Sequence, residues 1–205
     1  MPFAAQHIRA ARLHLQKSDP VMKKIIKTVG PFKQVVIRDR FLSLVRSIVS
    51  QQISTAAART IQQRLVDAIA PGKVEPLAIL KFSVDDLREI GISRQKATYM
   101  LDLAEKVDDG GVDLKNIGRK SDEEVIQSLT QVKGIGVWTA QMFLMFSLAR
   151  MDVFPDGDLG IQNGIEKNYS VRGKLTRDKM LKIAQPWKPY STVASWYLWR
   201  SLEVE

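Results

Sequence analysis

Three aspartates that follow an apolar segment are the residues of this chain best suited to carry out chemistry. Asp152, Asp156 and Asp158 all lie in "MDVFPDGDLG", residues 151–160. An ionised carboxylate can stabilise a developing positive charge or deprotonate a water molecule. Asp158 is expected at the start of a helix, where the positive end of the helix dipole keeps its carboxylate ionised near pH 7. A simple helix-capping role is the alternative for each of the three.

A glycine turn precedes these aspartates in "QVKGIGVWTA", residues 131–140. Two helices joined by a tight Gly-x-Gly hairpin aim backbone N–H groups outward from the second helix, which favours an anion such as a DNA phosphate. Gly134 and Gly136 would permit the close approach that a side chain would block. Ile135 would point inward and hold the two helices together. On the turn alone, an ordinary helix–helix connection is an equally good interpretation.

The composition narrows the classes of site that the chain can hold. It has no cysteine, which excludes disulfides, iron–sulfur clusters and thiolate zinc sites. Its two histidines, His7 and His14, have no third ligand nearby in the sequence, so no metal site is expected there.

The net charge of +9 comes from 31 basic and 22 acidic residues and is unevenly distributed. Between Val84 and Ile126, acidic residues outnumber basic ones by 11 to 7, so the positive charge is concentrated in the rest of the chain. A basic face of this size favours a polyanionic partner, most simply nucleic acid. A basic protein without such a partner is the alternative.

Helices account for almost all of the elements that must position these residues. Capping residues and apolar stripes at helical spacing mark their limits. The sequence "QVVIR", residues 34–38, is the single strand-like stretch, and it is too short to make a sheet. We therefore predict an all-α fold. The expected helices begin at Ser18–Pro20 (with Ser18 as the cap, to about Val29), Arg40 (to about "SQQIS"), Ser54, Ser83, Ser93 (to about Val107), Ser121, Val137 (to about Arg150), after Asp158, and at Tyr190 (to Leu202).

Several segments together resemble a known family. "VKGIGVWTA" followed by "DVFPDGDLG" is similar to the helix–hairpin–helix (HhH-GPD) DNA glycosylases, in which a hairpin is followed by a Gly/Pro-rich loop and an aspartate. "FLSLVRSIVSQQISTAAARTI", "GISRQKATYM" and "WKPYSTVASWYLW" match the 3-methyladenine DNA glycosylase II type in order and spacing. The resemblance extends over roughly Ser18 to Ser201.

The resemblance implies a two-lobed helical fold with the active site in the cleft between the lobes. We expect a central lobe at 40–130 and a second lobe formed by 1–39 and 151–205, with the hairpin segment 129–150 at their junction. The additional N-terminal sheet domain of the longest family members is not expected, because no strand-rich segment precedes Ser18.

The family pattern also implies roles for individual residues. It selects Asp158 as the catalytic carboxylate, with Asp156 as the second choice. Family members that also cut the DNA strand carry a lysine where this chain has Trp138, so we expect a monofunctional glycosylase without lyase activity. The residues matching the base pocket are Trp138, Trp199, Met142 and Leu159.

Tryptophan faces attract a cationic alkylated purine through stacking and cation–π contact. The family often has aromatic residues at the positions of Met142 and Leu159, so the range of lesions stays open. Trp138 with Met142 and Met145 could instead belong to the core.

DNA contacts follow from the same resemblance. The loop "SQQIS" occupies the place of the wedge that fills the gap left by a flipped base; Gln52 matches the wedge, and the neighbouring Ile53 is the alternative. A simple interhelical turn is the other interpretation of this loop. The hairpin contacts are expected from Lys133, Gly134, Gly136 and Thr139.

No cofactor is expected to be required for the reaction. The hairpins of this family often bind a monovalent cation, Na⁺ or K⁺, through main-chain carbonyls, here those of Thr130, Val132 and Gly134.

The expected function is hydrolytic release of alkylated purines, of the 3-methyladenine and 7-methylguanine type, from double-stranded DNA in base excision repair. The alternatives are a related glycosylase for oxidised or deaminated bases and a non-catalytic hairpin module that only binds DNA. With no long apolar run and no secretory signal, we expect a soluble monomer that does not contact membranes. It would be cytoplasmic and nucleoid-associated in a bacterium, or nuclear in a eukaryote.

Overall fold

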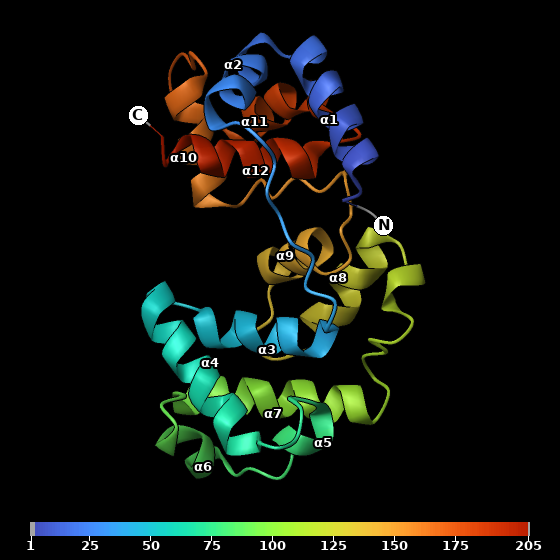
Figure 1. Cartoon of the computed structure of the whole chain (residues 1–205), viewed down its shortest axis with the longest axis vertical. Helices are drawn as coiled ribbons and strands as arrows, with labels where there is room; N and C mark the ends of the chain where they lie inside the picture. The colour runs from blue at the N-terminus through green and yellow to red at the C-terminus, as the bar shows by residue number, and fades with distance from the viewer. Residues whose placement is uncertain (1–2, 205) are drawn as a thin grey trace. The chain divides into compact units, whose positions relative to one another are not determined.

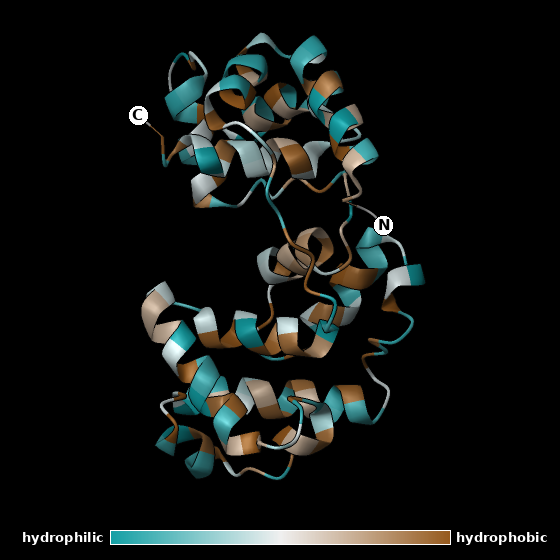
Figure 2. Ribbon diagram, viewed as in Figure 1, coloured by the Kyte–Doolittle hydropathy of each residue, from teal (hydrophilic) through white to brown (hydrophobic). Residues whose placement is uncertain are grey.

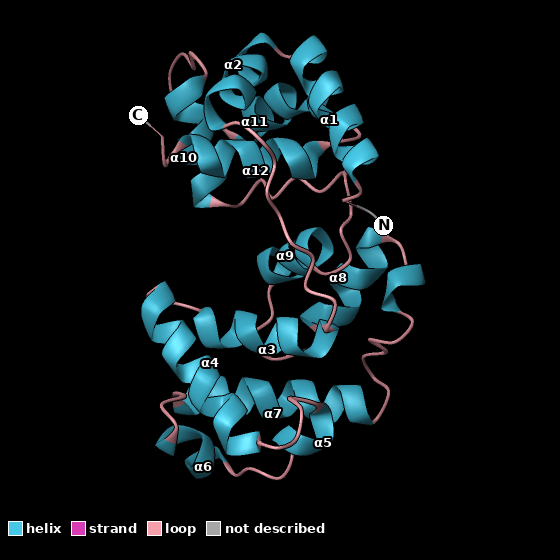
Figure 3. Cartoon of the chain, viewed as in Figure 1, coloured by secondary structure: helices cyan, strands magenta, loops and turns pink. Residues whose placement is uncertain are grey.

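The computed structural model describes residues 3–204, and within them the fold is helical throughout (Figures 1 and 3). No β-strand occurs among the described residues, which confirms the all-α prediction, and "QVVIR" forms part of a loop. The α-helices are α1 (Ala5–Ser18), α2 (Pro20–Val29), α3 (Arg40–Ser50), α4 (Thr55–Ile69), α5 (Pro76–Ile79), α6 (Val84–Glu89), α7 (Arg94–Asp108), α8 (Asp122–Thr130), α9 (Val137–Phe146), α10 (Leu159–Asn168), α11 (Arg177–Ala184) and α12 (Ser191–Ser201). Two short 3₁₀ helices, η1 (Ile117–Arg119) and η2 (Gln185–Trp187), complete the set.

The chain divides into two compact units. The middle unit is Ile37–Phe143, and the terminal unit combines Met1–Val36 with Leu144–Glu205. The hairpin between α8 and α9 belongs to the middle unit, and Asp158 belongs to the terminal unit. Helices of both units carry apolar residues beside polar ones (Figure 2), as expected for helices that each bury one face.

In the middle unit, α7 is the central helix. It packs against α3, α5 and α6, and α3 also packs against α4. The apolar stripe of α3 is buried, with Leu44, Ile48 and Val49 fully inaccessible to solvent. Met100 and Leu103 of α7 are buried in the same way. The stripe at helical spacing therefore became the core, as the sequence predicted.

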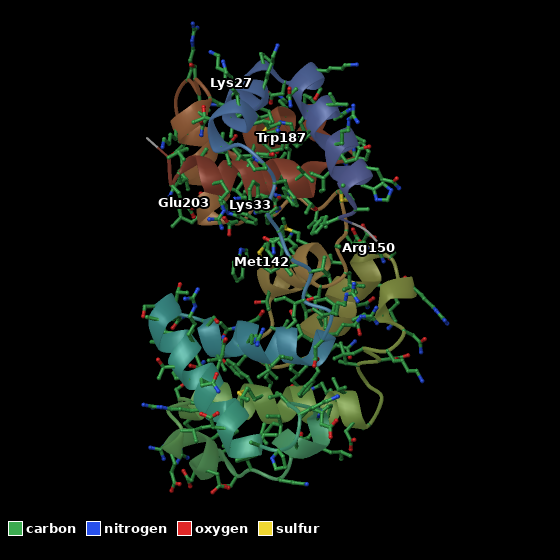
Figure 4. All side chains as sticks on the ribbon, viewed as in Figure 1. Lys27, Lys33, Met142, Arg150, Trp187 and Glu203 are labelled. Atoms are coloured by element: carbon green, nitrogen blue, oxygen red, sulfur yellow. The ribbon has the colours of Figure 1, made fainter. Side chains whose placement is uncertain are left out.

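In the terminal unit, α12 is the helix that the others surround. It packs against α1, α2 and α10, and it is buried over nearly its whole length. Trp187 is fully buried in the same core and lies among these helices in Figure 4. The two ends of the sequence thus build a single core.

Helix caps account for most of the boundaries. Ser54, Ser93 and Ser121 accept hydrogen bonds from the first turns of α4, α7 and α8 as predicted, and Ser83 forms a capping box with Asp86.

Two predicted helix features differ from the structure, and one helix was not predicted. Ser18 was expected to cap the helix that begins at Pro20, but Ser18 ends α1 and the Asp19 side chain caps α2. The helix starting at Val137 ends at Phe146, not near Arg150, because Ala149 adopts a left-handed φ of 52° and the Arg150 N–H turns back to the Leu144 carbonyl at 2.9 Å. Helix α11, which Thr176 caps, was not predicted.

Within residues 3–204, no helix combines the length and the apolar content that crossing a membrane requires.

Candidate active site

Asp158 caps α10, which confirms that it lies at a helix start. Its Oδ1 accepts a hydrogen bond from the Ile161 backbone N–H at 2.8 Å and another from the Trp199 indole N–H at 2.8 Å. The side chain is half-buried. Because two N–H groups on different helices fix one carboxylate oxygen, the carboxylate is held in a defined orientation while it keeps contact with solvent.

The other two aspartates are committed to other contacts. Asp156 forms an ion pair with the Arg177 side chain. Asp152 accepts hydrogen bonds from the Ser191 hydroxyl at 2.5 Å and the Ser191 N–H at 3.3 Å, at the start of α12. These contacts tie Asp156 to Arg177 and Asp152 to the start of α12, within the terminal unit.

Gly160 is the residue that lets the Trp199 indole reach Asp158. A Cβ atom at Gly160 would lie 2.8 Å from Trp199 Cδ1 and 3.0 Å from Asp158 Oδ1. Both distances are shorter than van der Waals contact permits, so any larger residue would displace the indole or the carboxylate. Trp199 also packs against Phe146, with ring centroids 6.0 Å apart. Trp199 therefore contacts both an aromatic ring and the Gly160 backbone.

The hairpin between α8 and α9 has the predicted form. Helix α8 ends at Thr130 and α9 begins at Val137, and Ile135 is buried as expected. Gly134 has a φ of +77°, and a Cβ there would lie 2.0 Å from the Tyr99 ring. Tyr99 packs directly against the Gly134 backbone, so this glycine is required for both dihedral and packing reasons.

Gly136 differs from Gly134 although the two belong to the same turn. A Cβ at Gly136 would meet no heavy atom of the protein within 4 Å. Gly136 directly precedes α9, and it has no side chain with which to cap that helix. The packing of the protein therefore does not explain this glycine.

Asp102 of α7 holds the hairpin in place through a hydrogen bond, and the sequence did not predict this role. Its Oδ2 accepts hydrogen bonds from the Lys133 N–H at 2.9 Å and from Lys106 Nζ at 2.6 Å, and its side chain is buried. Burial opposes ionisation, but the bonds from Lys106 and Lys133 outweigh it and hold the Asp102 pKa below its ordinary value. A charged residue between the core positions Met100 and Leu103 was the signal that could have identified it.

Comparisons with known proteins identify the family of this chain. The model of the HhH-GPD superfamily of base excision DNA repair proteins matches residues 45–189, which is more than half of the chain. The chain belongs to this superfamily. A Schizosaccharomyces pombe protein named DNA-3-methyladenine glycosylase 1 is 34% identical over 196 residues, covering 93% of this chain and 86% of its own.

A solved S. pombe structure, the 3-methyladenine DNA glycosylase Mag1 with abasic DNA, superposes with a TM-score of 0.82 at 32% identity, over 95% of this chain and 97% of that one. The Bacillus subtilis protein YfjP is also 34% identical, over 78% of this chain, and the chain spans 58% of its length.

The loop predicted to carry the wedge, residues 51–54 and called the wedge loop below, is exposed at its tip. Gln52 is exposed and has a left-handed φ of 56°, and Ile53 is 37% exposed. Gln51 behaves differently, because its Nε2 donates a hydrogen bond to the Gly134 carbonyl of the hairpin at 2.9 Å. The sequence did not predict this contact, which joins residues 83 positions apart.

The residues predicted to contact DNA or a cation at the hairpin differ in their exposure and in their hydrogen bonds. The Lys133 side chain is 71% exposed, while Thr139 as a whole is buried at 5% exposure. Of the three carbonyls predicted for a cation, that of Val132 accepts the Ile135 N–H at 3.1 Å and that of Gly134 accepts Gln51. A carbonyl oxygen has two lone pairs, so each retains capacity for one further contact.

The four residues predicted for the base pocket belong to both units. Leu159 and Trp199 belong to the terminal unit, as does Asp158, whereas Trp138 and Met142 project from the part of α9 that belongs to the middle unit (Figure 4 labels Met142). Trp138 is 48% exposed and Leu159 is 68% exposed.

Proposed function

We propose that this protein is a DNA glycosylase that hydrolyses the N-glycosidic bond of alkylated purines, such as 3-methyladenine and 7-methylguanine, in base excision repair. Membership of the HhH-GPD superfamily and the likeness to 3-methyladenine glycosylases support this reaction class. The observation that carries the proposal is the carboxylate of Asp158, capped on α10 and oriented by Trp199.

Asp158 is the proposed catalytic residue. As the bond to the base breaks, positive charge develops at C1′ of the sugar, and a fixed carboxylate nearby stabilises it. The same carboxylate can orient or deprotonate the attacking water. An alkylated purine is already cationic and leaves readily, so modest assistance from the protein is sufficient.

Trp199 has two functions in this proposal. Its indole N–H holds the Asp158 carboxylate, and its ring offers a π-face to a cationic base. Trp138, nearly half exposed, offers a second indole face. Met142 and Leu159 would supply apolar contacts that do not discriminate among lesions, which suits a broad substrate range.

The hairpin is the proposed phosphate-binding element, and double-stranded DNA is the partner. The first-turn N–H groups of an α-helix have no acceptor within the helix, and the absence of a side chain at Gly136 lets a phosphate approach them at the start of α9. Lys133 adds an exposed positive charge beside the turn. Gln52, with Ile53 as the alternative, is the proposed residue that fills the gap after base flipping.

We further propose that the enzyme is monofunctional. Strand cleavage by this family requires an amine nucleophile that forms a Schiff base with C1′. This chain has Trp138 at the matching position, and an indole cannot form that adduct. Abasic DNA should therefore accumulate as the product, and strand breaks should appear only after alkali treatment. Nicking by the pure protein without alkali would contradict this part of the proposal.

A monovalent cation at the hairpin stays a separate proposal. The carbonyls of Thr130, Val132 and Gly134 would hold Na⁺ or K⁺, and the charge of the ion would add to the attraction for a phosphate. If the ion binds there, affinity for duplex DNA at constant ionic strength should change when K⁺ replaces tetramethylammonium. Equal affinity in the two salts would contradict cation binding at the hairpin without affecting the reaction proposed for Asp158.

The reaction is tested by incubating the protein with three duplexes and identifying the released bases by chromatography. Alkylated DNA should yield free methylpurines, while undamaged DNA should yield none. Preferential release from a duplex containing oxidised or deaminated bases would instead identify the related glycosylase class. No release from any duplex, with binding retained, would indicate a module that only binds DNA.

A further inference from the structure

One face of α7 supports two segments that are far apart in the sequence. Lys96, Tyr99 and Asp102 are three residues apart along the helix and therefore share a face. Lys96 Nζ donates to the Val49 carbonyl near the C-terminal end of α3 at 2.8 Å, just before the wedge loop. Tyr99 and Asp102 contact the hairpin at Gly134 and at the Lys133 N–H, as described above. The same rigid helix thus fixes the root of the wedge loop and the base of the hairpin.

Gln51 connects these two segments directly. Its side-chain amide donates to the Gly134 carbonyl at 2.9 Å, and its own backbone N–H bonds to Ile48 at the end of α3. Because the acceptor is a carbonyl oxygen, the partner must carry an N–H or O–H donor. Glutamine meets that requirement without adding a charge beside the hairpin.

The contact restrains the residue that follows. Gln52 has the left-handed φ of 56°, a conformation that non-glycine residues keep only where the surrounding structure holds them. On its N-terminal side, Gln51 is bonded to the hairpin. On its C-terminal side, the Ser54 hydroxyl accepts the Ala57 N–H at 3.2 Å and ties the loop to α4. The exposed tip is therefore held at both ends.

We propose that Gln51 is a positioning residue that locks the wedge loop to the hairpin, so that the gap-filling residue and the phosphate-binding turn engage DNA at a fixed spacing. The inference rests on the proposed function for its DNA partner. Base flipping requires that the gap be filled while the backbone is gripped. A loop ordered before DNA arrives loses less conformational entropy on binding.

Hydrogen exchange on the DNA-free protein tests the lock itself. Gln51→Met keeps the length of the side chain, removes the donor and adds no charge. We expect exchange to rise about three- to tenfold in peptides covering 48–58 and 130–137, the effect of losing one hydrogen bond. Gln52→Ala, the neighbouring control, should leave the hairpin peptide unchanged. Unchanged exchange at the hairpin in Gln51→Met would overturn the inference, and so would a uniform rise that includes α5 and α6, which would indicate general loosening.

Binding to a duplex with an abasic-site analogue tests the consequence for DNA. If Gln51 acts by placing Gln52, the Gln51→Met and Gln52→Ala effects on affinity should not multiply, and the double variant should bind as Gln52→Ala does. We expect each single change to weaken binding about three- to tenfold. Multiplying effects would show that Gln51 acts independently of Gln52 and would overturn the inference.

A different result would contradict the proposed function: the wild-type protein would release no methylpurine from alkylated DNA. That result would leave the exchange test of the lock unaffected.

Discussion

Asp19 and Asp158 occupy the same local setting within the terminal unit and differ in how completely the protein surrounds them. Each caps a helix, and each accepts a hydrogen bond from an indole N–H, that of Trp187 for Asp19 and that of Trp199 for Asp158. Asp19 is 6% exposed, and its two oxygens accept four hydrogen bonds, from Val21, Met22, Tyr169 and Trp187. Asp158 is half-buried, and its indole and backbone donors both fall on Oδ1.

The comparison indicates how one motif can serve stability or chemistry. The buried Asp19 carboxylate, with four donors on its two oxygens, has no room for a substrate, whereas the partly exposed Asp158 carboxylate is oriented by two donors and stays in contact with solvent. The environment of Asp19 also affects its neighbours: burial raises the pKa of the Tyr169 hydroxyl, and the hydrogen bond to Asp19 raises it further. Burial and the placement of the donors, not residue type, distinguish the two sites.

The largest expected effect on folding comes from Asp19→Asn. The new amide group would face hydrogen-bond donors in a buried site, which leaves at least one of them unsatisfied. We expect the free energy of unfolding to fall by about 3 kcal/mol, measured by urea denaturation. Base release per folded molecule should not change. A loss of activity without a loss of stability would place Asp19, not Asp158, in the chemistry.

A second buried carboxylate, Asp102 in the middle unit, extends the comparison to pH. Its folded-state pKa lies below the ordinary value of 3.8, so the charged carboxylate stabilises the fold above about pH 4. This contribution is lost as the pH falls through the folded pKa. We expect Asp102→Asn to lower the free energy of unfolding by about 1.5–3 kcal/mol at pH 7, with a smaller difference from the wild type at pH 3. A difference that stays constant down to pH 3 would contradict the assignment.

The two indole donors offer a matched pair of smaller changes. Trp187→Phe and Trp199→Phe each keep an aromatic ring and remove one N–H. We expect Trp187→Phe to cost about 1–3 kcal/mol of stability, because a buried carboxylate loses a donor. Trp199→Phe should cost less stability but slow base release about 10- to 100-fold through a misoriented carboxylate. Thermal unfolding would measure the loss of stability in each variant, and single-turnover kinetics would measure the rate of base release. Equal losses of stability and equal release rates in the two variants would contradict the different roles assigned to Asp19 and Asp158.

The smallest expected effect on folding is that of Asp158→Asn. Asparagine caps helices about as well as aspartate, and its side-chain oxygen can still accept the Ile161 and Trp199 N–H groups. We expect the free energy of unfolding to change by no more than about 0.5 kcal/mol. A loss as large as that of Asp19→Asn would show that Asp158 is primarily structural.

Local signals predicted most of the fold. Ser54, Ser93 and Ser121 were correctly identified as caps because capping depends on residues within one turn of the helix. The choice between Ser18 and Asp19 failed because both residue types cap well, and donors from distant Trp187 and Tyr169 decide between them.

The candidate site was predictable only in part. Asp158 and the hairpin glycines lie within 25 residues of one another, so a continuous pattern reveals them. Gln51 and Asp102 reach the hairpin from 83 and 31 residues away, and the spacing of residue types carries no information about such contacts. The difference between Gly134 and Gly136 depends on where the Tyr99 ring lies, which again only the structure shows.

The most direct test of the central claim is single-turnover release of 3-methyladenine from alkylated duplex DNA by the wild type and by Asp158→Asn at neutral pH. If Asp158 stabilises the developing charge, the variant should remain folded and bind DNA while its release rate falls about 10²- to 10³-fold. Equal release rates for the two proteins would contradict the assignment of Asp158 as the catalytic carboxylate.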